Sequence, residues 1–415
     1  MNVFVNPKQT IEELKDLRSL TGDEHGAQRV AFTEKWTIAR TWLREKLEAL
    51  PVEVHTDAAG NLWATLKGQS EQELLMGGHI DSVPNGGWLD GCLNTLTALA
   101  SLRRIIEQYG TQPPVTIRLV DWADEEGARF GKSLFGSSAC SGTLNMDEAR
   151  GLTDADGIKL VDALRDCGID FEKVKDSGVE LKNASAYLEL HIEQGPVLLD
   201  LDLPLGTVLG TFGVERHAIT FHGQAAHSGS TPMNRRKDAL LAAARMSPEI
   251  YAITERHEGV CTIGSCVTKP GIVTSVVEQC QITLDQRHLD AAGLAKMLAE
   301  AKQASADFAA AGDVTVDWTR LWQIEPILFH EKLIELCDQA ITETCGKTHR
   351  LPSGPLHDAA EPARVGIPTI MMFVQSLHGI SHNKIEDTKE AHLELSVIAF
   401  DKLVEKTIHW LTDSL

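Results

Sequence analysis

Hydrophobic residues at the start of the chain recur with helical spacing. Apolar positions three or four residues apart follow a helix-start signal at Asn6–Pro7, and the same spacing returns over residues 36–47. Two short apolar runs, 52–54 and 62–66, then flank a turn at 57–60. This pattern predicts two helices followed by a β-hairpin.

Strands and helices alternate beyond the hairpin. Apolar runs at 73–76, 115–120 and 187–192 have strand length, and residues 93–109 have helical spacing. Runs without polar alternation are typical of strands that are buried on both faces. The alternation therefore predicts an α/β domain built on a largely buried sheet.

The pattern changes near Gly210 and stays different until Pro326. The expected order between them is strand, helix, strand, strand, helix, strand, over residues 218–222, 237–245, 262–267, 281–287, 291–311 and 314–318. This β-α-β-β-α-β order suits a small, ferredoxin-like open-faced sandwich.

The α/β character returns after Pro326, with a helix over 330–345, an apolar strand over 369–374 and a C-terminal helix. The smaller domain is therefore expected as an insertion in the larger one. We predict an α/β protein of two domains: residues 1–209 with 327–415, and an α+β domain over 210–326.

Composition narrows the functional classes. With 43% hydrophobic and 24% charged residues, the 415-residue chain is an ordinary globular protein, long enough for two domains. A net charge of −20 disfavours nucleic acid and anionic membranes as partners. The chain shows no secretory signal and no membrane-spanning apolar run. The eight cysteines form no CxxC pair, so a cytoplasmic protein with reduced thiols is expected.

The segment GGHIDSVPNGGWLDG, residues 77–91, is the strongest candidate for chemistry. His79 follows an apolar strand, where α/β folds place ligands. Asp81 is placed to accept the second imidazole N–H of that histidine. Asp90 follows in a loop whose glycines let the backbone approach a ligand. Taken alone, such a loop is more often a solvated turn.

Three further segments place ionisable residues at strand ends. In VDWADEEGARF a buried-type strand runs into Asp124, Glu125 and Glu126, whose burial is costly without a cation. His191 lies in LELHIEQGP and His382 in HGISHNKIEDT. Taken alone, each segment has a more ordinary interpretation. The three acids would form an exposed acidic turn, His191 would be a hydrogen-bonded core histidine, and His382 would lie in a surface loop.

Together the four segments supply imidazoles and carboxylates suited to zinc or a similar divalent ion. The chain resembles the aminoacylase and carboxypeptidase-G metallohydrolases, in the hydantoinase/carbamoylase branch with N-carbamoyl-L-amino-acid hydrolases, allantoate amidohydrolases and β-ureidopropionases. The motifs HIDSVPNGGWLDG, DEEGARF, ELHIEQGP, HSGSTPMNRRKDA, HDA and GISHNKIED carry the resemblance, in the family's order over nearly the whole chain.

The resemblance implies a site for two divalent ions, with zinc as the first expectation and manganese, cobalt or nickel as alternatives. Its five ligands are shared as follows: His79 and His191 on one ion, Glu126 and His382 on the other, and Asp90 bridging both. The resemblance also makes Glu125 the general base. Paired ions can activate a water and polarise the scissile carbonyl of a linear amide.

The resemblance extends to the inserted domain, which it makes a lid and dimerisation domain. His227, in FHGQAAHSGSTPM, is expected to stabilise the developing oxyanion in the other subunit of a homodimer. Gln194 resembles a substrate-contacting glutamine, and Arg287 an arginine that pairs with a substrate carboxylate. His357, in the HDA motif, is also expected at the substrate.

Departures from the family pattern concern the substrate. Thr274 stands where the family usually has asparagine, Glu215 where glutamine is usual, and Asn94 where glycine is common. Pro355 and Leu356 partly replace a glycine pair. Because an extra carboxylate at 215 disfavours an anionic neighbour, we hypothesise a substrate whose far end is not a plain α-amino-acid carboxylate.

Three functional classes are compared. The leading expectation is hydrolysis of a small carbamoyl or ureido compound. The alternatives are an aminoacylase- or dipeptidase-like amide hydrolase and an inactive metal-binding scaffold, which would have no need of Glu125. An NAD-dependent dehydrogenase is excluded by the lack of a GxGxxG motif after the first strand.

Overall fold

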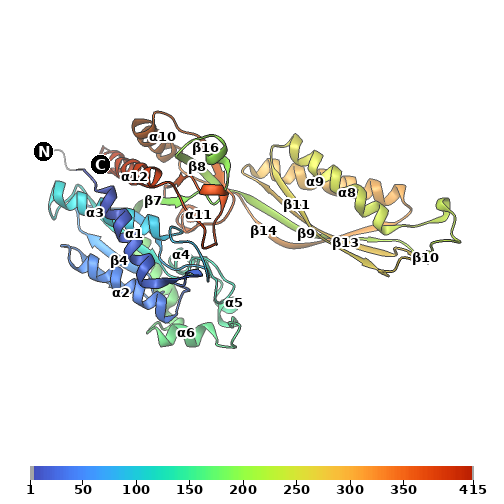
Figure 1. Ribbon diagram of the computed structural model, residues 1–415, viewed down its shortest axis with the longest axis horizontal. Coiled ribbons are helices and arrows are strands. Elements are labelled where there is room, and N and C mark those ends of the chain that lie inside the picture. The colour runs from blue at the N-terminus through green and yellow to red at the C-terminus, as the bar shows by residue number, and fades with distance from the viewer. Residues whose placement is uncertain (1–3, 414–415) are drawn as a thin grey trace. The chain divides into compact units, whose positions relative to one another are not determined.

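A computed structural model describes residues 4–413 (Figure 1). The chain forms two compact units. The larger unit comprises the chain up to Leu209 and from Phe329 onward, and the smaller unit comprises Gly210–Leu328. The predicted class is confirmed, because the larger unit is built on a mixed sheet and the smaller one on a separate antiparallel sheet.

The sheet of the larger unit has the strand order β15-β8-β17-β7-β5-β6-β4-β3, with β16 added beside β8. Its strands are β3 (Glu53–Thr56), β4 (Leu62–Leu66), β5 (Ser70–His79), β6 (Val115–Trp122), β7 (Ala184–Ile192), β8 (Leu205–Thr211), β15 (Ile327–Leu328), β16 (Arg350–Ser353) and β17 (Thr369–Val374). The central strands β17, β7, β5 and β6 are parallel, and the flanking β3, β4, β8 and β15 pair antiparallel. The carboxyl ends of four strands therefore share one edge of the sheet.

Five long helices belong to the larger unit: α1 (Pro7–Thr21), α2 (Glu34–Glu48), α3 (Cys92–Tyr109), α10 (Glu331–Cys345) and α12 (Glu390–Asp413). The predicted start of α1 is confirmed, since Asn6 caps it by accepting a hydrogen bond from the Gln9 amide. Helix α3 contacts β5, β6 and β7 and is buried over most of its length. Its N-cap, Gly91, lies against His79 at the end of β5.

Short elements fill the stretch between β6 and β7, where the sequence pattern predicted nothing. They are α4 (Phe135–Cys140), α5 (Met146–Arg150), α6 (Leu160–Asp166) and the 3₁₀ segment η1 (Phe171–Leu181). The three α-helices are six, five and seven residues long, about two turns or fewer, so no apolar period can build up along them. The remaining elements are β1 (Gly22–Asp23), β2 (Gly26–Ala27), α7 (Val197–Asp200), α11 (Ala360–Arg364) and η3 (Leu377–Gly379).

The smaller unit has the predicted β-α-β-β-α-β order: β9 (Gly213–His222), α8 (Ala239–Arg256), β11 (Val260–Lys269), β13 (Gln279–His288), α9 (Ala291–Ala311) and β14 (Thr315–Ile324). The antiparallel order is β11-β13-β9-β14, and residues of both helices join the core against the sheet. A side ribbon pairs β10 (Ala226–His227) with β12 (Ser275–Val276), and η2 (Met233–Arg235) follows β10 in the chain.

Helix α8 is longer than predicted. The helix was predicted over residues 237–245, but it runs to Arg256 with Pro248 inside it, although proline lacks an N–H and crowds the preceding turn. The helix continues because its buried apolar stripe crosses Pro248, with Met246 before the proline and Ile250 and Ile253 after it. Among residues 4–413, no helix has the length and apolar character needed to cross a membrane.

Candidate metal centre

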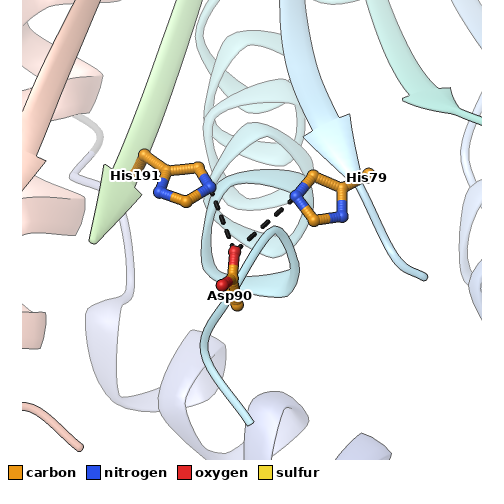
Figure 2. A group of neighbouring side chains, drawn as sticks. All are labelled: His79, Asp90 and His191. Carbon is orange, nitrogen blue, oxygen red and sulfur yellow. Dashed lines mark ion pairs between the residues drawn. The ribbon is translucent and has the colours of Figure 1, made fainter. Parts of the chain in front are cut away.

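Two histidines approach one aspartate at the carboxyl edge of the larger sheet (Figure 2). His79 is the last residue of β5 and His191 lies near the end of β7, and both are almost fully buried. Asp90 directly precedes Gly91, the N-cap of α3. Its Oδ1 lies 3.2 Å from Nε2 of His191 and 3.7 Å from Nε2 of His79. We call His79, Asp90 and His191 the first group.

Gly91 makes this approach possible. Its φ is 66°, in the left-handed region that favours glycine. A Cβ atom at this position would lie 2.4 Å from the Cε1 atom of the His79 ring. The glycine therefore lets the start of α3 carry Asp90 up against the histidine.

Asp90 also belongs to a second group, with Glu126 and His382. Nε2 of His382 lies 3.3 Å from Oε2 of Glu126 and 3.5 Å from Oδ2 of Asp90. In each group the donor atoms lie within 4.8 Å of one another. The side-chain amide of Gln194 donates to Oδ2 of Asp90 over 2.9 Å. The structure thus brings the five predicted ligands together around Asp90, with Gln194 beside them.

Asp81 acts differently from the prediction. Nδ1 of His79 lies 3.2 Å from the backbone carbonyl oxygen of Asp81 and 3.6 Å from its carboxylate, so the carbonyl is the hydrogen-bond acceptor. The carboxylate instead accepts the backbone N–H groups of Glu125 and Glu126, each over 3.2 Å. Asp81 therefore hydrogen-bonds the segment after β5 to the loop after β6, at the two consecutive glutamates.

Glu125 faces the first group, with Oε2 3.7 Å from Nε2 of His79. Burial, followed by the charges of Asp358 and Glu126, raises its pKa well above the usual value. Burial and the Asp90 charge likewise raise the pKa of Glu126. These acids are crowded together away from water, which favours either bound protons or a compensating cation.

The first group compensates part of its own charge. Burial lowers the pKa of His191, but the hydrogen bond and charge of Asp90 outweigh burial and raise the pKa to about 9. Burial would raise the pKa of Asp90, yet His191 and His79 lower it overall. His79 shows the opposite balance, because burial lowers its pKa to about 4. One imidazole of the group is therefore held charged and the other neutral.

The donor atoms fit divalent metal ions. Nε2 of His79 and Oε1 of Glu126 are buried without a hydrogen-bond partner within the described part of the chain. Buried polar atoms of this kind normally have partners. A set of imidazole and carboxylate ligands suits zinc and similar ions. Residues of both groups could therefore hold metal.

Sequence reasoning missed Glu386, which positions Asp90. Its buried Oε1 accepts the backbone N–H groups of Leu89 and Asp90, over 3.2 and 3.1 Å. Burial and the charge of Asp90 raise the Glu386 pKa to about 8. The available signal was its place in the motif GISHNKIED, the same motif that holds His382.

His357 lies deeper than expected of a substrate contact. It is 2% exposed, and its ring centroid lies 4.2 Å from that of His191. A donor atom of His357 also lies within 4.8 Å of ligand atoms of Glu189 and His191. His357 therefore packs against His191, and its expected contact with the substrate stays a prediction.

In the smaller unit, Glu215 is paired internally. Its carboxylate lies 2.7 Å from Nε2 of His217 and 3.2 Å from Nε of Arg320. Along β9 it alternates in step with Ile219 and Phe221, which belong to the core that α8 and α9 cover. Because Glu215 is already paired on the core-facing side of the sheet, Thr274 is the stronger of the two departures, and the role of Glu215 at the substrate stays a prediction.

Arg287 lies on the other face of the same sheet. Its Nε donates to Asp285 over 2.8 Å, and Arg216 approaches the same carboxylate within 2.7 Å. Because successive strand residues point to opposite faces, Arg216 and Glu215 point away from each other. Asp285 thus orients two guanidinium groups on the face away from Glu215.

His227 and Thr274 are neighbours through the β10–β12 ribbon. The Ser228 amide donates to the carbonyl of Thr274 over 3.0 Å. Nδ1 of the exposed His227 accepts the amides of Gly229 and Ser230, over 3.1 and 3.2 Å. Because Nδ1 is an acceptor, a neutral His227 carries its proton on Nε2. Its outward nitrogen is therefore a hydrogen-bond donor.

Comparison with known proteins gives consistent matches over the chain. The family model of peptidase family M20/M25/M40 matches residues 75–406. Allantoate amidohydrolase of Escherichia coli is 32% identical over 391 residues, covering 92% of this chain and 93% of that protein. N-carbamoyl-L-amino acid amidohydrolase of Geobacillus stearothermophilus is 34% identical over 369 residues, covering 88% and 90%.

A solved structure shares the whole fold. The crystal structure of an amidase of the hydantoinase/carbamoylase family from Burkholderia multivorans has a TM-score of 0.85 and 28% identity. The match covers 98% of this chain and 99% of that one. With the family match and the relatives above 30% identity, the chain belongs to peptidase family M20/M25/M40, in its hydantoinase/carbamoylase branch, and is an amidohydrolase.

Proposed function

We propose that the protein hydrolyses the linear C–N amide bond of a small carbamoyl or ureido compound, such as an N-carbamoyl-amino acid or an allantoate-like molecule. The observation that carries the proposal is the position of Asp90, whose two oxygens face two ligand groups while Glu125 lies 3.7 Å from His79. Relatives named allantoate amidohydrolase and N-carbamoyl-L-amino acid amidohydrolase support the choice of substrate class.

The proposed cofactor is a pair of divalent ions, with zinc expected first and manganese, cobalt or nickel as alternatives. His79 and His191 would hold one ion, Glu126 and His382 the other, and Asp90 both. When bound, such ions polarise a substrate carbonyl and lower the pKa of water. The orphaned Nε2 of His79 and Oε1 of Glu126, one in each group, support this assignment.

Glu125 is the proposed general base. It accepts a proton from the attacking water and delivers that proton to the leaving nitrogen, while the C–N bond breaks. Asp81 supports this role by holding the backbone N–H of Glu125, which limits where the carboxylate can point. A carbamoyl substrate R–NH–CO–NH₂ would react with one water to give the free amine R–NH₂, carbon dioxide and ammonia, the last two both from the carbamoyl group.

His227 is proposed to donate from Nε2 to the developing oxyanion in the partner subunit of a homodimer. The two amides that bind Nδ1 support this, because they leave the proton on the outward nitrogen. Mixing inactive Glu125→Gln and His227→Ala proteins tests the arrangement. Subunit exchange should restore part of the activity if each site uses residues of both chains, and no restoration would contradict it.

Substrate contacts are proposed for Gln194, Thr274 and Arg287. Arg287 would pair with a substrate carboxylate, and Asp285 supports this by fixing the direction of its guanidinium group. Thr274 lies beside His227 and lacks the amide N–H₂ of the family's asparagine. The far end of the substrate is therefore proposed to differ from a plain α-amino-acid carboxylate, on the basis of Thr274 rather than Glu215.

The substrate class is tested with metal-reconstituted enzyme on a panel of ureido compounds, N-acyl-amino acids and dipeptides. Ammonia release from ureido compounds supports the proposal, whereas turnover confined to acyl-amino acids or dipeptides favours the other amide hydrolase. Thr274→Asn should improve turnover of N-carbamoyl-amino acids, and Glu215→Gln should leave specificity unchanged. A wild type that binds metal but hydrolyses nothing would favour the scaffold.

The proposed compartment is the cytoplasm. The eight cysteines are all free thiols, and four of them (Cys92, Cys140, Cys280 and Cys337) are buried in the cores. Reduced thiols are typical of proteins that work in a reducing compartment. Detection of a disulfide in protein isolated from the native cell would contradict this placement.

A further inference from the structure

Asn94 lies at the point where the three segments of the first group meet. Its side chain is fully buried one turn into α3, the helix whose start carries Asp90. Its Nδ2 donates to the carbonyl of Gly77 in β5, and its Oδ1 accepts the Leu190 amide over 3.0 Å. One side chain thus links the helix start to both histidine-bearing strands.

These hydrogen bonds stand where the backbone pairing between β5 and β7 has already ended. The pairing of β5 with β7 ends at Met76 and Leu188, although both strands continue to His79 and Ile192 beside their other neighbours. The ends that carry the two histidines are therefore separated. Backbone groups left inside a protein require partners. Asn94 provides one donor and one acceptor in that gap.

The space for Asn94 is provided by Gly78. A Cβ at Gly78 would lie 2.8 Å from Nδ2 and 3.3 Å from Cβ of Asn94. The Tyr187 hydroxyl donates to the same Gly77 carbonyl over 2.7 Å, from the β7 side. The backbone around Gly77 and Gly78 is thus arranged to receive polar groups from α3 and β7.

We propose that Asn94 is a positioning residue for the first metal ion, which it serves by setting the separation of His79, His191 and Asp90. The inference rests on the proposed metal centre and concerns a position where this chain departs from the glycine common in its family. A glycine there would remove the link between Gly77 and Leu190 and leave the Tyr187 hydroxyl and the outer neighbouring strands to hold the two strand ends. The geometry of the first group would then depend on the metal itself.

The test compares metal binding by the wild type, Asn94→Gly and Asn94→Ala, using titration against a chromophoric chelator and the visible spectrum of Co²⁺-loaded protein. We expect the tighter site to lose affinity by about 10- to 100-fold, as for other residues that orient metal ligands. The Co²⁺ spectrum of that site should change as its coordination changes. These readouts need no substrate.

Thr97→Val is the matched control. Thr97 lies one turn further along α3, is equally buried, and has a hydroxyl with no hydrogen-bond partner in the described residues. Its removal should leave metal affinity and the Co²⁺ spectrum as in the wild type. Circular dichroism of the metal-free proteins checks the fold in each case.

Three outcomes are separable. Wild-type affinity and an unchanged spectrum in both Asn94 variants would overturn the inference. Failure of both Asn94 variants to fold without metal, while Thr97→Val folds, would also overturn it, because Asn94 would then be a general core residue. A wild type that binds no metal would instead remove the proposed function on which the inference rests.

Discussion

The two metal groups share Asp90 but are built from different kinds of structure. The first takes its histidines from parallel strands, and all three of its residues are buried. The second takes Glu126 and His382 from loops, and the His382 side chain is 49% exposed. His382 also has φ 54°, a left-handed conformation that is uncommon for a histidine.

The difference indicates that the two ions of the proposed centre would be bound in two different ways. Strands and a helix hold the first group in place before an ion arrives, so little ordering accompanies binding. The second group depends on a loop residue that solvent reaches, and loops are the more mobile part of a fold. We therefore expect a tight first site and a more exchangeable second site.

The largest effect is expected where the groups overlap. Asp90→Asn removes the one charge that both groups use, so the protein should bind neither ion and lose all hydrolytic activity. Metal content by mass spectrometry and a turnover assay measure this. Asp200→Asn, at an exposed position, is the control. Retention of two ions by Asp90→Asn would contradict the proposal that Asp90 is a ligand of both ions.

Glu125→Gln should separate chemistry from metal binding. It removes the proposed base while leaving every proposed ligand, so both ions should remain and kcat should fall by about 10²- to 10⁴-fold. Metal content and steady-state kinetics on the same preparation measure the two effects. Loss of metal together with activity would assign Glu125 to the first group instead.

His79→Ala and His382→Ala compare the groups directly. His79→Ala should remove the tight site, because it deletes a buried ligand from a preformed group. His382→Ala should keep about one tightly held ion per chain, since the first group is intact. Chelator competition ranks the two variants. Equal losses would show that the two groups bind as one unit.

A smaller effect is expected in the pH dependence of the metal-free protein. The folded pKa of Glu386 is about 8, raised by burial and the Asp90 charge from 4.5, so its protonated form is lost as pH rises through 8. Burial lowers the pKa of His191, but Asp90 raises it to about 9 from 6.5. In both cases the folded state binds more protons than the unfolded chain, so stability falls as pH rises from 6.5 to 8.

Thermal unfolding of metal-free protein between pH 6.5 and 8 measures how steeply the free energy of unfolding falls with pH. Glu386→Gln should make this fall with pH less steep, because, of the two titrating residues, only His191 remains. Metal-loaded protein should show a flatter profile, since bound ions favour the ionised carboxylates. A rising stability over the same range would contradict this view of the charge balance.

Much of the fold was predictable because its long elements carry clear periods. Helices such as α3 and α9 and the apolar strands β6, β7 and β17 were predicted within a few residues of their ends. The order of the smaller unit followed from the same reasoning. The region 133–181 was not predictable in this way, because its helices are too short to show a period.

The candidate ligands were predictable because strand ends in a parallel sheet share one edge, and four motifs lie at such ends. Their partners were harder to foresee. Whether Asp81 would bind an imidazole or backbone amides depends on loop geometry after β6. The pairing of Glu215 with Arg320 depends on strand register, which brings together residues more than a hundred positions apart.

The smaller unit begins and ends on adjacent strands. Leu328 pairs with Gly210 and Ile327 with Thr211, so the segments that enter and leave the smaller unit lie side by side as an antiparallel strand pair. A segment with neighbouring ends can be gained, lost or exchanged without rerouting the host polypeptide. The insertion therefore adds only the edge strand β15 beside β8 and leaves the order of the other strands in this sheet uninterrupted.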